Sequence, residues 1–289
     1  MLQQLVNGLV LGSIYALIAL GYTMVYGVLQ LINFAHGEIY MAGAFLGLYL
    51  TVSLKLPFPV AFVLAMAGAA LIGVTVERIA YRPLRRSPRL AVLISAIGMS
   101  IFLQNLSLYL NGPATRGFLP PFKVYPIRIG EIKTSSLEVI ILVVAILLMV
   151  GLQYLIRRTK IGKAMRATAL DKETAALMGI NVDRIISYTF AIGSSLGAAA
   201  GVLVGMYLNA VDPMMGLMPG LKGFVAAVLG GIGNIPGAMA GGLILGTAEV
   251  FGVAFMRSEW RDAIAFAILI VVLLIKPSGI LGQNTQEKV

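Results

Sequence analysis

The segment Leu137–Ile156, LEVIILVVAILLMVGLQYLI, decides the class of this protein. It is almost entirely apolar, and about 20 such residues in a helix cross the hydrocarbon core of a bilayer. The composition of the whole chain points the same way, because 59% of its residues are hydrophobic and 12% are charged. Soluble domains have roughly 45–50% and 25%. The sequence therefore predicts a polytopic membrane protein.

Comparable apolar runs lie on both sides of this segment. We expect about eight membrane-spanning helices in one all-α transmembrane helix bundle, forming a single transmembrane domain over residues 1–289. Glycine is abundant, at 33 residues, as is usual where helices pack closely in lipid. The expected spans are Leu5–Leu29, Asn33–Ser53, Val60–Ile79, Leu90–Leu110, Leu137–Ile156, Ile185–Asn209, Ala238–Phe255 and Ala263–Ile275.

One apolar segment, near residues 222–237, is interrupted. Gly223–Gly231 offers only about nine helical residues, which cover about half of the bilayer core. Several glycines, Asn234 and Pro236 follow before the apolar run resumes at Ala238. We expect a broken or re-entrant helix, because such backbone survives at depth only where protein or a water-filled cavity surrounds it. Crossing and re-entry both remain open.

Lysine and arginine give the orientation. The formal net charge is +10, and its placement fits membrane topology rather than nucleic-acid binding. The loops Arg78–Arg89 and Arg157–Arg184 carry five and seven of the 22 basic residues, whereas Asn111–Ser136 carries four. Loops rich in positive charge stay in the cytoplasm. We therefore expect the N-terminus outside, and the C-terminus inside if the interrupted segment adds one net crossing together with its continuation.

The cytoplasmic loop at residues 157–184 contains most of the longest polar segment with helix signals, GKAMRATALDKETAALMGINVDRI (Gly162–Ile185). Asp171 is the expected N-cap, because its carboxylate can accept from free backbone N–H groups. Gly179 stands where a left-handed C-terminal cap is wanted. The helix between them has about two turns and is marginal alone in water. We therefore expect its Ala175–Met178 side to pack partly against another protein.

Three polar residues, Asn33, His36 and Glu38, open the second expected span. Asn33 and His36 are three positions apart and would share a helix face. Ionisable groups at membrane depth usually face a cavity or a partner, which makes these residues candidates for a translocation pathway or a gate. The alternative is local, with Asn33 shaping a helix start and His36 bonding a neighbouring carbonyl. Both interpretations stay open.

Lys222, Asn234 and Glu249 complete the candidates for the pathway. Glu249 lies inside the seventh span, where it either serves proton or solute movement or makes an interhelical hydrogen bond. Lys222 stands at the mouth of the broken helix. It either attracts a carboxylate or reaches toward the membrane surface.

The residues that enzymes and cofactor sites need are scarce. One histidine and no cysteine leave no Cys/His cluster for zinc or haem, so we expect no metal and no cofactor. No nucleophile–base set and no phosphate-binding loop is recognisable. We therefore expect no enzyme activity, and the energy for any transport has to come from another subunit.

Several blocks of the sequence resemble one family of transporters. ETAALMG (Glu173–Gly179) resembles the EAA loop of ABC-importer permeases, although Thr174 precedes the paired alanines. Nearly the whole chain resembles the permease of branched-chain amino acid ABC importers, the LivH type. The blocks that carry this resemblance are GYTMVYGVLQLINFAHGEIYMAG (Gly21–Gly43), ERIAYRPLRRS (Glu77–Ser87), LISAIGMSIFLQN (Leu93–Asn105) and GLKGFVAAVLGGIGNIPGAMAGGLILGTAE (Gly220–Glu249).

The resemblance implies a subunit of an ATP-driven importer for leucine, isoleucine or valine in a bacterial inner membrane. Its implied partners are a homologous second permease, two cytoplasmic ATP-binding subunits, an extracytoplasmic solute-binding protein and the lipid bilayer. The short helix would be the coupling helix that docks into an ATPase. The residues expected to make this contact are Asp171, Glu173, Ala175, Ala176 and Gly179.

Other functions remain open from the sequence. Relatives with a similar INFAHGE segment handle urea, short amides or other amino acids. An ion-coupled secondary transporter or channel would use the broken helix with Glu249 or His36. In this alternative the short polar helix between the fifth and sixth spans has no evident role. A third reading is a passive scaffold in a membrane complex.

Overall fold

The computed structural model describes residues 1–85 and 87–282. The protein is mostly helical, and six helices are long and apolar enough to cross a membrane. Four of them are α1 (Leu2–Leu29), α5 (Ser136–Arg158), α8 (Val182–Tyr207) and α10 (Ile235–Phe255). The other two are α4 (Arg89–Asn111) and α3 (Phe58–Val76), the latter continued by a π-helix (Glu77–Tyr81) and a 3-10 turn (Arg82–Leu84).

The remaining helices are shorter. α2 (His36–Leu48) continues into a π-helix, Tyr49–Ser53, and α9 (Leu217–Gly230) is the shorter apolar helix that follows α8. α6 (Lys160–Leu170) and α7 (Lys172–Leu177) occupy the polar loop after α5. A 3-10 turn (Ser258–Trp260) leads into α11 (Arg261–Ile275). The C-terminus, which we expected on the cytoplasmic side, and Arg86 of the first basic loop lie outside the described residues.

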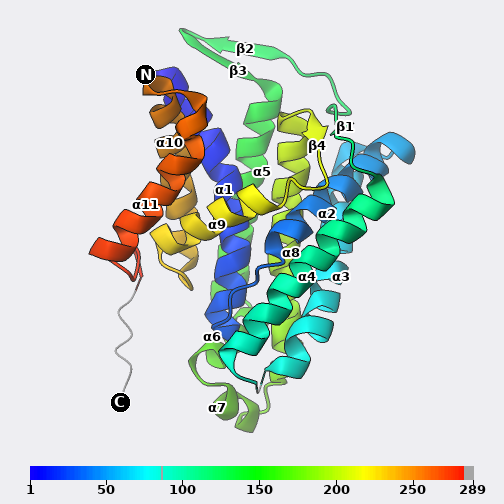
Figure 1. The fold of residues 1–289 in the computed structure, drawn as a ribbon, viewed down its shortest axis with the longest axis vertical. Helices are drawn as coiled ribbons and strands as arrows, with labels where there is room; N and C mark the ends of the chain where they lie inside the picture. Colours follow the sequence, from blue (N-terminus) through cyan, green and yellow to red (C-terminus); the bar gives the residue numbers. More distant parts are fainter. Residues whose placement is uncertain (86, 283–289) are drawn as a thin grey trace.

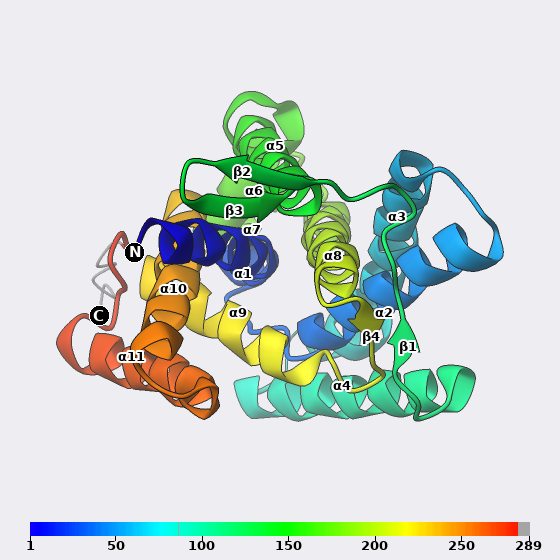
Figure 2. The same cartoon turned by 90° about the horizontal axis from the view of Figure 1, so that it is seen from above.

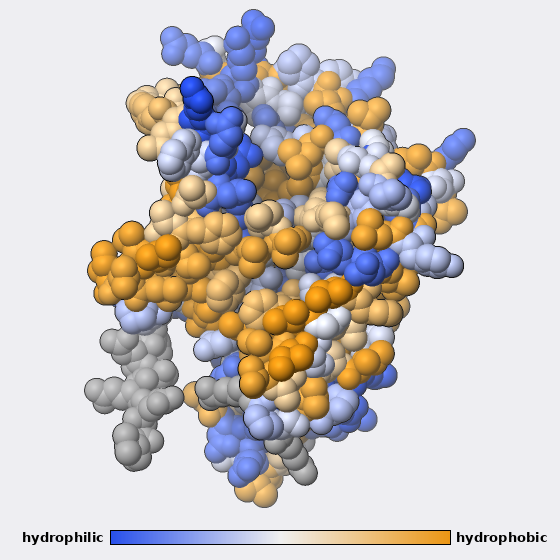
Figure 3. Space-filling model, in the orientation of Figure 1, coloured by the Kyte–Doolittle hydropathy of each residue, from blue (hydrophilic) through white to orange (hydrophobic). Residues whose placement is uncertain are grey.

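α1 and α8 form the centre of the bundle, with α10 and α9 beside α1 and α2 and α3 beside α8 (Figures 1 and 2). α1 and α10 pack through glycine, since a Cβ on Gly12 would lie 2.8 Å from Leu243 Cα. Small residues let helices approach this closely in lipid. The outer helices expose apolar side chains, and Figure 3 shows a hydrophobic belt between two hydrophilic ends. This is the surface that a bilayer requires.

Two segments are broken at their N-terminal ends. A non-helical stretch, residues 30–35, precedes α2, and a turn, residues 212–216, precedes α9. The two helices then begin against each other, with Gly37 on Gly216 and Gly220. The predicted interruption near 222–237 is present at residues 231–234, where Gly231 and Gly233 have φ of 106° and 90°. α9 is longer than the expected nine residues because Pro219 fits in its first turn.

The expectation of an entirely α-helical chain needs one correction. Four short strands form two antiparallel pairs at one end of the bundle (Figure 1). β2 (Pro126–Ile129) pairs with β3 (Ile132–Ser135), and β1 (Arg116–Gly117) pairs with β4 (Ala210–Val211). Gly130, with φ of 61°, makes the tight turn between β2 and β3. The strands are too short for a clear alternation of apolar residues, so the sequence showed only a polar connection.

The two ends of the described chain lie at opposite ends of the bundle. Near the N-terminus, Gln3 Nε2 donates to the carbonyl oxygen of Lys133 in β3, at 2.8 Å. At the other end, the backbone N–H of Leu281 donates to the Gly230 carbonyl at 3.0 Å, where α9 ends. α6 and α7 lie at the end of the bundle where α1 finishes, because Lys172 Nζ donates to the Leu29 carbonyl at 3.3 Å.

Candidate functional site

The structure places His36 inside the bundle, partway along α1 and α8. Its imidazole fills the space over two glycines, Gly21 of α1 and Gly197 of α8. The Tyr22 ring meets it edge-on, with ring centroids 4.7 Å apart. Within residues 1–85 and 87–282, neither ring nitrogen finds a hydrogen-bond partner. His36 therefore fixes the packing of α2 between α1 and α8.

Asn33 shapes the turn that leads into α2. Its side-chain oxygen accepts from the backbone N–H of Ala35 at 3.2 Å and from the Tyr81 hydroxyl at 3.0 Å. An asparagine that bonds its own backbone two residues on forms an Asx turn. The local interpretation therefore describes Asn33 well, and the Tyr81 bond also ties the broken segment to the end of α3.

Glu38, in the first turn of α2, lines a cavity. It is 3% exposed, and its carboxylate accepts from the Ser100 hydroxyl of α4 at 3.4 Å. Its other oxygen lies beside Gly216, 2.9 Å from where a Cβ of that residue would stand. A cavity of about 310 Å³ opens here, lined by Glu38, Ser100, Gly216 and Gly220 among others. Two helix N-termini, those of α2 and α9, favour a negative charge at this position.

Lys222 and Glu249 form a buried ion pair between α9 and α10. Lys222 Nζ lies 2.9 Å from Glu249 Oε1 and 2.7 Å from Asp262 Oδ1 of α11. The Tyr15 hydroxyl of α1 donates to Glu249 Oε2 at 3.0 Å. Glu249 is fully buried, whereas half of the Asp262 side chain is exposed. The interhelical bond expected of Glu249 is thus present, and Lys222 is paired inside the protein.

This ion pair stands at the wall of a second cavity, of about 510 Å³, enclosed by α1, α8, α9, α10 and α11. Lys222, Asp262 and Arg261 line it on one side, and Tyr15 and Tyr40 contribute hydroxyl-bearing rings. Sequence reasoning missed Arg261 as a member of this group and missed Asp262 entirely. Their position at the start of the last short span was the available signal.

Asn234 lies away from these residues, at the opposite end of the bundle. Its side-chain oxygen accepts from the Gly237 backbone N–H at 3.2 Å, which caps α10. Its amide donates to the Leu281 carbonyl at 2.6 Å. Asn234 therefore holds the start of α10 against the C-terminal segment, and the structure does not bring it to either cavity.

The predicted cap residues of the short helix are confirmed. Asp171 Oδ1 accepts from the backbone N–H groups of Glu173 and Thr174 at 2.8 and 3.1 Å, and Oδ2 accepts from the Thr174 hydroxyl at 2.7 Å. These bonds, with the Thr174 hydroxyl first, lower the pKa of Asp171. Gly179 has φ of 82° and donates to the Ala176 carbonyl at 3.0 Å, and Ile180 donates to the Ala175 carbonyl at 3.0 Å. This pair of bonds is a Schellman motif.

α7 is anchored on one side only. Ala175 is 4% exposed, whereas Leu177 and Met178 are 87% and 79% exposed. Leu170, at the end of α6, is 89% exposed. Lys172 anchors the helix to the end of α1, and partial burial, followed by the charge of Arg85, lowers its pKa. Glu173 and Ala176 lie on the exposed surface.

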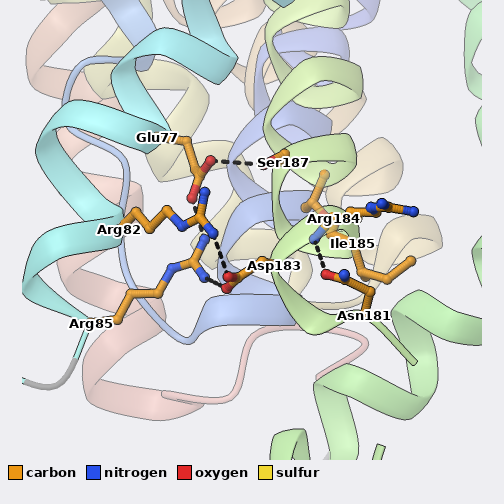
Figure 4. A network of polar contacts seen from close by, with 9 residues as sticks. Glu77, Arg82, Arg85, Asn181, Asp183, Arg184, Ile185 and Ser187 are labelled. Carbon is orange, nitrogen blue, oxygen red and sulfur yellow. Dashed lines mark hydrogen bonds and ion pairs between the residues drawn. The ribbon is translucent and has the colours of Figure 1, made fainter. Parts of the chain in front are cut away.

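A polar network beside α7 joins the end of α3 to the start of α8 (Figure 4). Asp183 accepts from Arg82 at 2.6 Å and from Arg85 at 2.5 Å. Arg85 also pairs with Glu77, which is fully buried and accepts from the Ser187 hydroxyl at 2.8 Å. Sequence reasoning assigned these arginines to topology alone. No local pattern connects residues about a hundred positions apart, so only the fold reveals the network.

Comparisons with known proteins agree along the whole chain. The family described as branched-chain amino acid transport system, permease component, matches residues 4–273. The chain is 46% identical to the high-affinity branched-chain amino acid transport system permease protein LivH of Escherichia coli, covering 100% of this chain and 97% of that protein. It is 48% identical to the permease protein BraD of the same kind of system in Pseudomonas aeruginosa, with 100% and 98% covered.

A solved structure adds a likeness of fold. PsaBC from Streptococcus pneumoniae, in complex with Fab, matches with a TM-score of 0.50 at 14% identity, over 94% of this chain and 91% of that chain. At this identity the likeness concerns the arrangement of helices alone.

Proposed function

The chain belongs to the family of branched-chain amino acid transport permeases, and we propose that it forms part of the membrane pathway of an ATP-driven importer for leucine, isoleucine and valine. The observation that carries this proposal is the similarity to LivH and BraD, which extends over the entire chain. The region matched by the family includes the starts of α2 and α9, where Gly37 meets Gly216. It also includes α7 and the Lys222–Glu249 pair. The proposed substrates follow from these relatives, which are permeases of branched-chain amino acid transport systems.

The proposed topology has nine passes. The six long helices are joined by three shorter ones, α2, α9 and α11, each preceded by non-α-helical backbone. An odd number of passes puts the two ends of the chain on opposite sides. The basic loops around Arg82 and α7 then face the cytoplasm and the β2–β3 hairpin faces outward. In a bacterium this is the inner membrane.

α7 is the proposed contact with the ATPase. It carries exposed apolar side chains, Leu177 and Met178, at the end of the bundle where the basic loops gather, and such exposed side chains outside the lipid belt favour a protein partner. We assign Asp171 and Gly179 to the two caps, Ala175 to the anchored side, and Glu173 and Ala176 to the docking surface. The further proposed partners are a second permease and an extracytoplasmic solute-binding protein.

Transport would proceed by alternating access, a shift between two arrangements of packed helices. Movement of α7 reaches α1 through Lys172 and the Leu29 carbonyl. It reaches α8 directly along the chain, and the Arg85–Asp183 pair passes it to α3. The crossing of α2 and α9, with Glu38 beside it, lies inside the bundle between these helices. We place Asn33, His36, Glu38, Lys222 and Glu249 on or beside the pathway, and Asn234 at its cytoplasmic end as a cap.

The test is uptake by the assembled transporter in proteoliposomes. We expect radiolabelled leucine, isoleucine and valine to accumulate when ATP and the solute-binding protein are supplied, and accumulation to persist with a protonophore. Uptake of urea or short amides in preference to leucine would contradict the proposed substrate and assign one of these compounds instead. Uptake that needs a proton gradient and ignores ATP would refute the ATP-driven mechanism.

A variant of the docking surface sharpens this test. Leu177→Ser removes an exposed leucine of α7 and should reduce co-purification of the ATPase subunits. Tyr125→Ser is a matched control, because Tyr125 is 61% exposed in the polar loop at the other end of the bundle. Equal co-purification in both variants would count against docking through α7.

A further inference from the structure

The cavity of about 510 Å³ opens at the end of the bundle that carries the β2–β3 hairpin. Gln4 and Asn7 of α1 line its mouth, and the neighbouring Gln3 bonds to β3. Its volume lies within the roughly 300–1,000 Å³ typical of small-molecule sites. One wall is aliphatic, formed by Leu11, Ile14, Val204, Val250 and Val253. This wall would cover a branched hydrocarbon side chain.

The other wall carries charges that cancel. Lys222, Arg261 and Asp262 line the cavity. The fully buried Glu249 lies behind Lys222, and its Oε2 is 4.0 Å from Arg261 Nε. The four groups together supply two positive and two negative charges. The Lys222–Glu249 pair is buried, whereas the side chains of Asp262 and Arg261 are 51% and 46% exposed. Asp262 and Arg261 can therefore exchange partners at little cost, while the inner pair stays intact.

Two further groups in the wall are unpaired. The Tyr40 hydroxyl is fully buried and lines the cavity, and it has no hydrogen-bond partner among the residues that the structure describes. An unpaired buried hydroxyl costs free energy unless a ligand or water satisfies it. The first turn of α9 also lines the cavity, at Met218 and Pro219, and no side chain of residues 1–85 or 87–282 caps it. A helix N-terminus favours a carboxylate.

We propose that this cavity is a transit site for a zwitterionic α-amino acid with an aliphatic side chain. This deepens the proposed function, on which it rests. The ligand's carboxylate takes the place of Asp262 at Lys222, beside Arg261, and its ammonium group pairs with the released Asp262. Tyr40 supplies a hydroxyl, and the aliphatic wall covers the side chain. Affinity is low, since a transit site has to release its ligand.

The cancelling charges favour a zwitterion over a simple ion. The cluster is neutral before binding, and a zwitterion leaves it neutral afterwards. A carboxylate or an ammonium ion alone would leave one uncompensated charge in a partly buried site, which is costly. The site therefore separates leucine from isocaproate, which lacks the ammonium group, and from isoamylamine, which lacks the carboxylate.

The test uses the absence of cysteine from the chain. Val253→Cys places a single thiol in the cavity wall, and Lys123→Cys places one on the exposed loop at the same end of the bundle. Both variants are assembled into the full transporter in nanodiscs and labelled with a charged maleimide. We expect millimolar L-leucine to slow labelling of Val253→Cys severalfold and to leave Lys123→Cys unaffected. Isocaproate and isoamylamine should protect neither.

A second substitution removes the exchanged partner. Asp262→Asn, made in the Val253→Cys chain, should abolish protection by leucine. The Asp262 side chain is half-exposed and Lys222 keeps its pairing with Glu249, so the substitution leaves no buried charge unpaired. Protection that persists in this variant, or that isocaproate provides equally well, overturns the proposal.

Filling the cavity gives a measurement that does not depend on labelling. Val253→Phe should reduce uptake of isoleucine more than uptake of the smaller valine, whereas Val143→Phe on the exposed face of α5 should change neither. Unchanged uptake in Val253→Phe, with leucine transported normally by the unmodified complex, refutes the site and leaves the proposed function standing. Protection by leucine without any ATP-driven uptake refutes the proposed function and supports the site.

Discussion

Gly37 and Gly216 meet backbone to backbone where α2 and α9 begin. A Cβ on Gly216 would lie 2.5 Å from the Gly37 carbonyl oxygen, well inside contact distance. The two residues lie in segments that are far apart in sequence, and in each segment a turn leads into the helix. Their contact brings two helix N-termini together inside the bundle, next to the Glu38 carboxylate. Broken helices that meet in this way are a common feature of transporter binding sites and gates.

Gly216→Ala should destabilise the permease, because the added methyl group has no space. The backbone of Gly216 has φ of −75° and suits any residue, so the effect is purely steric, and overpacking costs about 1–3 kcal/mol. We expect a lower midpoint of thermal unfolding in detergent. Gly151→Ala is the control, since a Cβ there meets nothing within 4 Å. Equal midpoints for the two variants would contradict the close crossing.

The lengths of the apolar runs predict much of the fold, but they do not predict the contact between α2 and α9. The runs around Leu5–Leu29 and Leu137–Ile156 predicted α1 and α5 to within a few residues, because a span of fixed thickness needs a fixed number of apolar residues. The second expected span began at Asn33, whereas α2 begins at His36. The Asx turn of Asn33 and the packing of Gly37 against Gly216 both act on where that helix starts, and the packing is not local in the sequence.

Gly179→Val should weaken coupling while leaving the bundle intact. Gly179 has φ of 82°, and an L-residue with a Cβ pays roughly 1–2 kcal/mol in the left-handed region. The Schellman motif would open, and α7 would lose its fixed position. We expect less leucine uptake per ATP hydrolysed in proteoliposomes and weaker co-purification of the ATPase subunits.

Gly130→Val is the matched control for this variant. Gly130 also has a positive φ, 61°, and, like Gly179, has nothing within 4 Å of an added Cβ. It lies in the hairpin at the opposite end of the bundle, so ATPase co-purification should stay at the level of the unmodified protein. A similar loss of co-purification in both variants would show that backbone strain anywhere in the chain weakens ATPase binding. The effect of Gly179→Val would then no longer support docking through α7.

Thr174→Val should raise the pKa of Asp171 toward the ordinary value of about 3.9, because the Thr174 hydroxyl is the first cause of its lowering. A carboxyl whose pKa is lowered on folding stabilises the fold above its ordinary pKa and loses that contribution as the pH falls through the lowered value. The cap of α7 should therefore be complete at neutral pH and persist to lower pH in the unmodified protein than in the variant.

Carbon-13 NMR of labelled aspartate carboxyls measures this pKa directly. The chain has four aspartates, and the Asp171 signal is assigned by its loss in Asp171→Asn. Thr115→Val is the control, since the Thr115 hydroxyl donates to Asp212 at 2.9 Å and should leave the Asp171 titration unchanged. An unaltered Asp171 titration in Thr174→Val would refute the hydroxyl's role.

The candidate sites differ in how far the sequence could define them. Asp171 and Gly179 were predictable because capping depends on residues within a few positions. Glu249 was recognisable as an interhelical group from its depth in a span. Its partner Lys222 was noticed only as a carboxylate attractor or an interfacial lysine, and Asp262 not at all, because α9 and α11 meet only in the folded bundle. The pairing of Glu77 with Arg85 was hidden for a different reason, because an irregular segment, a π-helix and a 3-10 turn, connects these two residues.

That pairing gives the last prediction. Glu77 is fully buried and pairs with Arg85, whereas Arg82 and Asp183 form an ion pair that is about half exposed. Arg85→Met should leave a buried carboxylate without its cation, which typically costs about 3–5 kcal/mol. Arg82→Met should cost about 0–1 kcal/mol, as exposed pairs do. Thermal unfolding should show a clearly lower midpoint for Arg85→Met, and Glu77→Gln in the same chain should restore most of it. Equal midpoints for the two arginine variants would mean that the network is held at Asp183 and that the buried Glu77 pair contributes nothing.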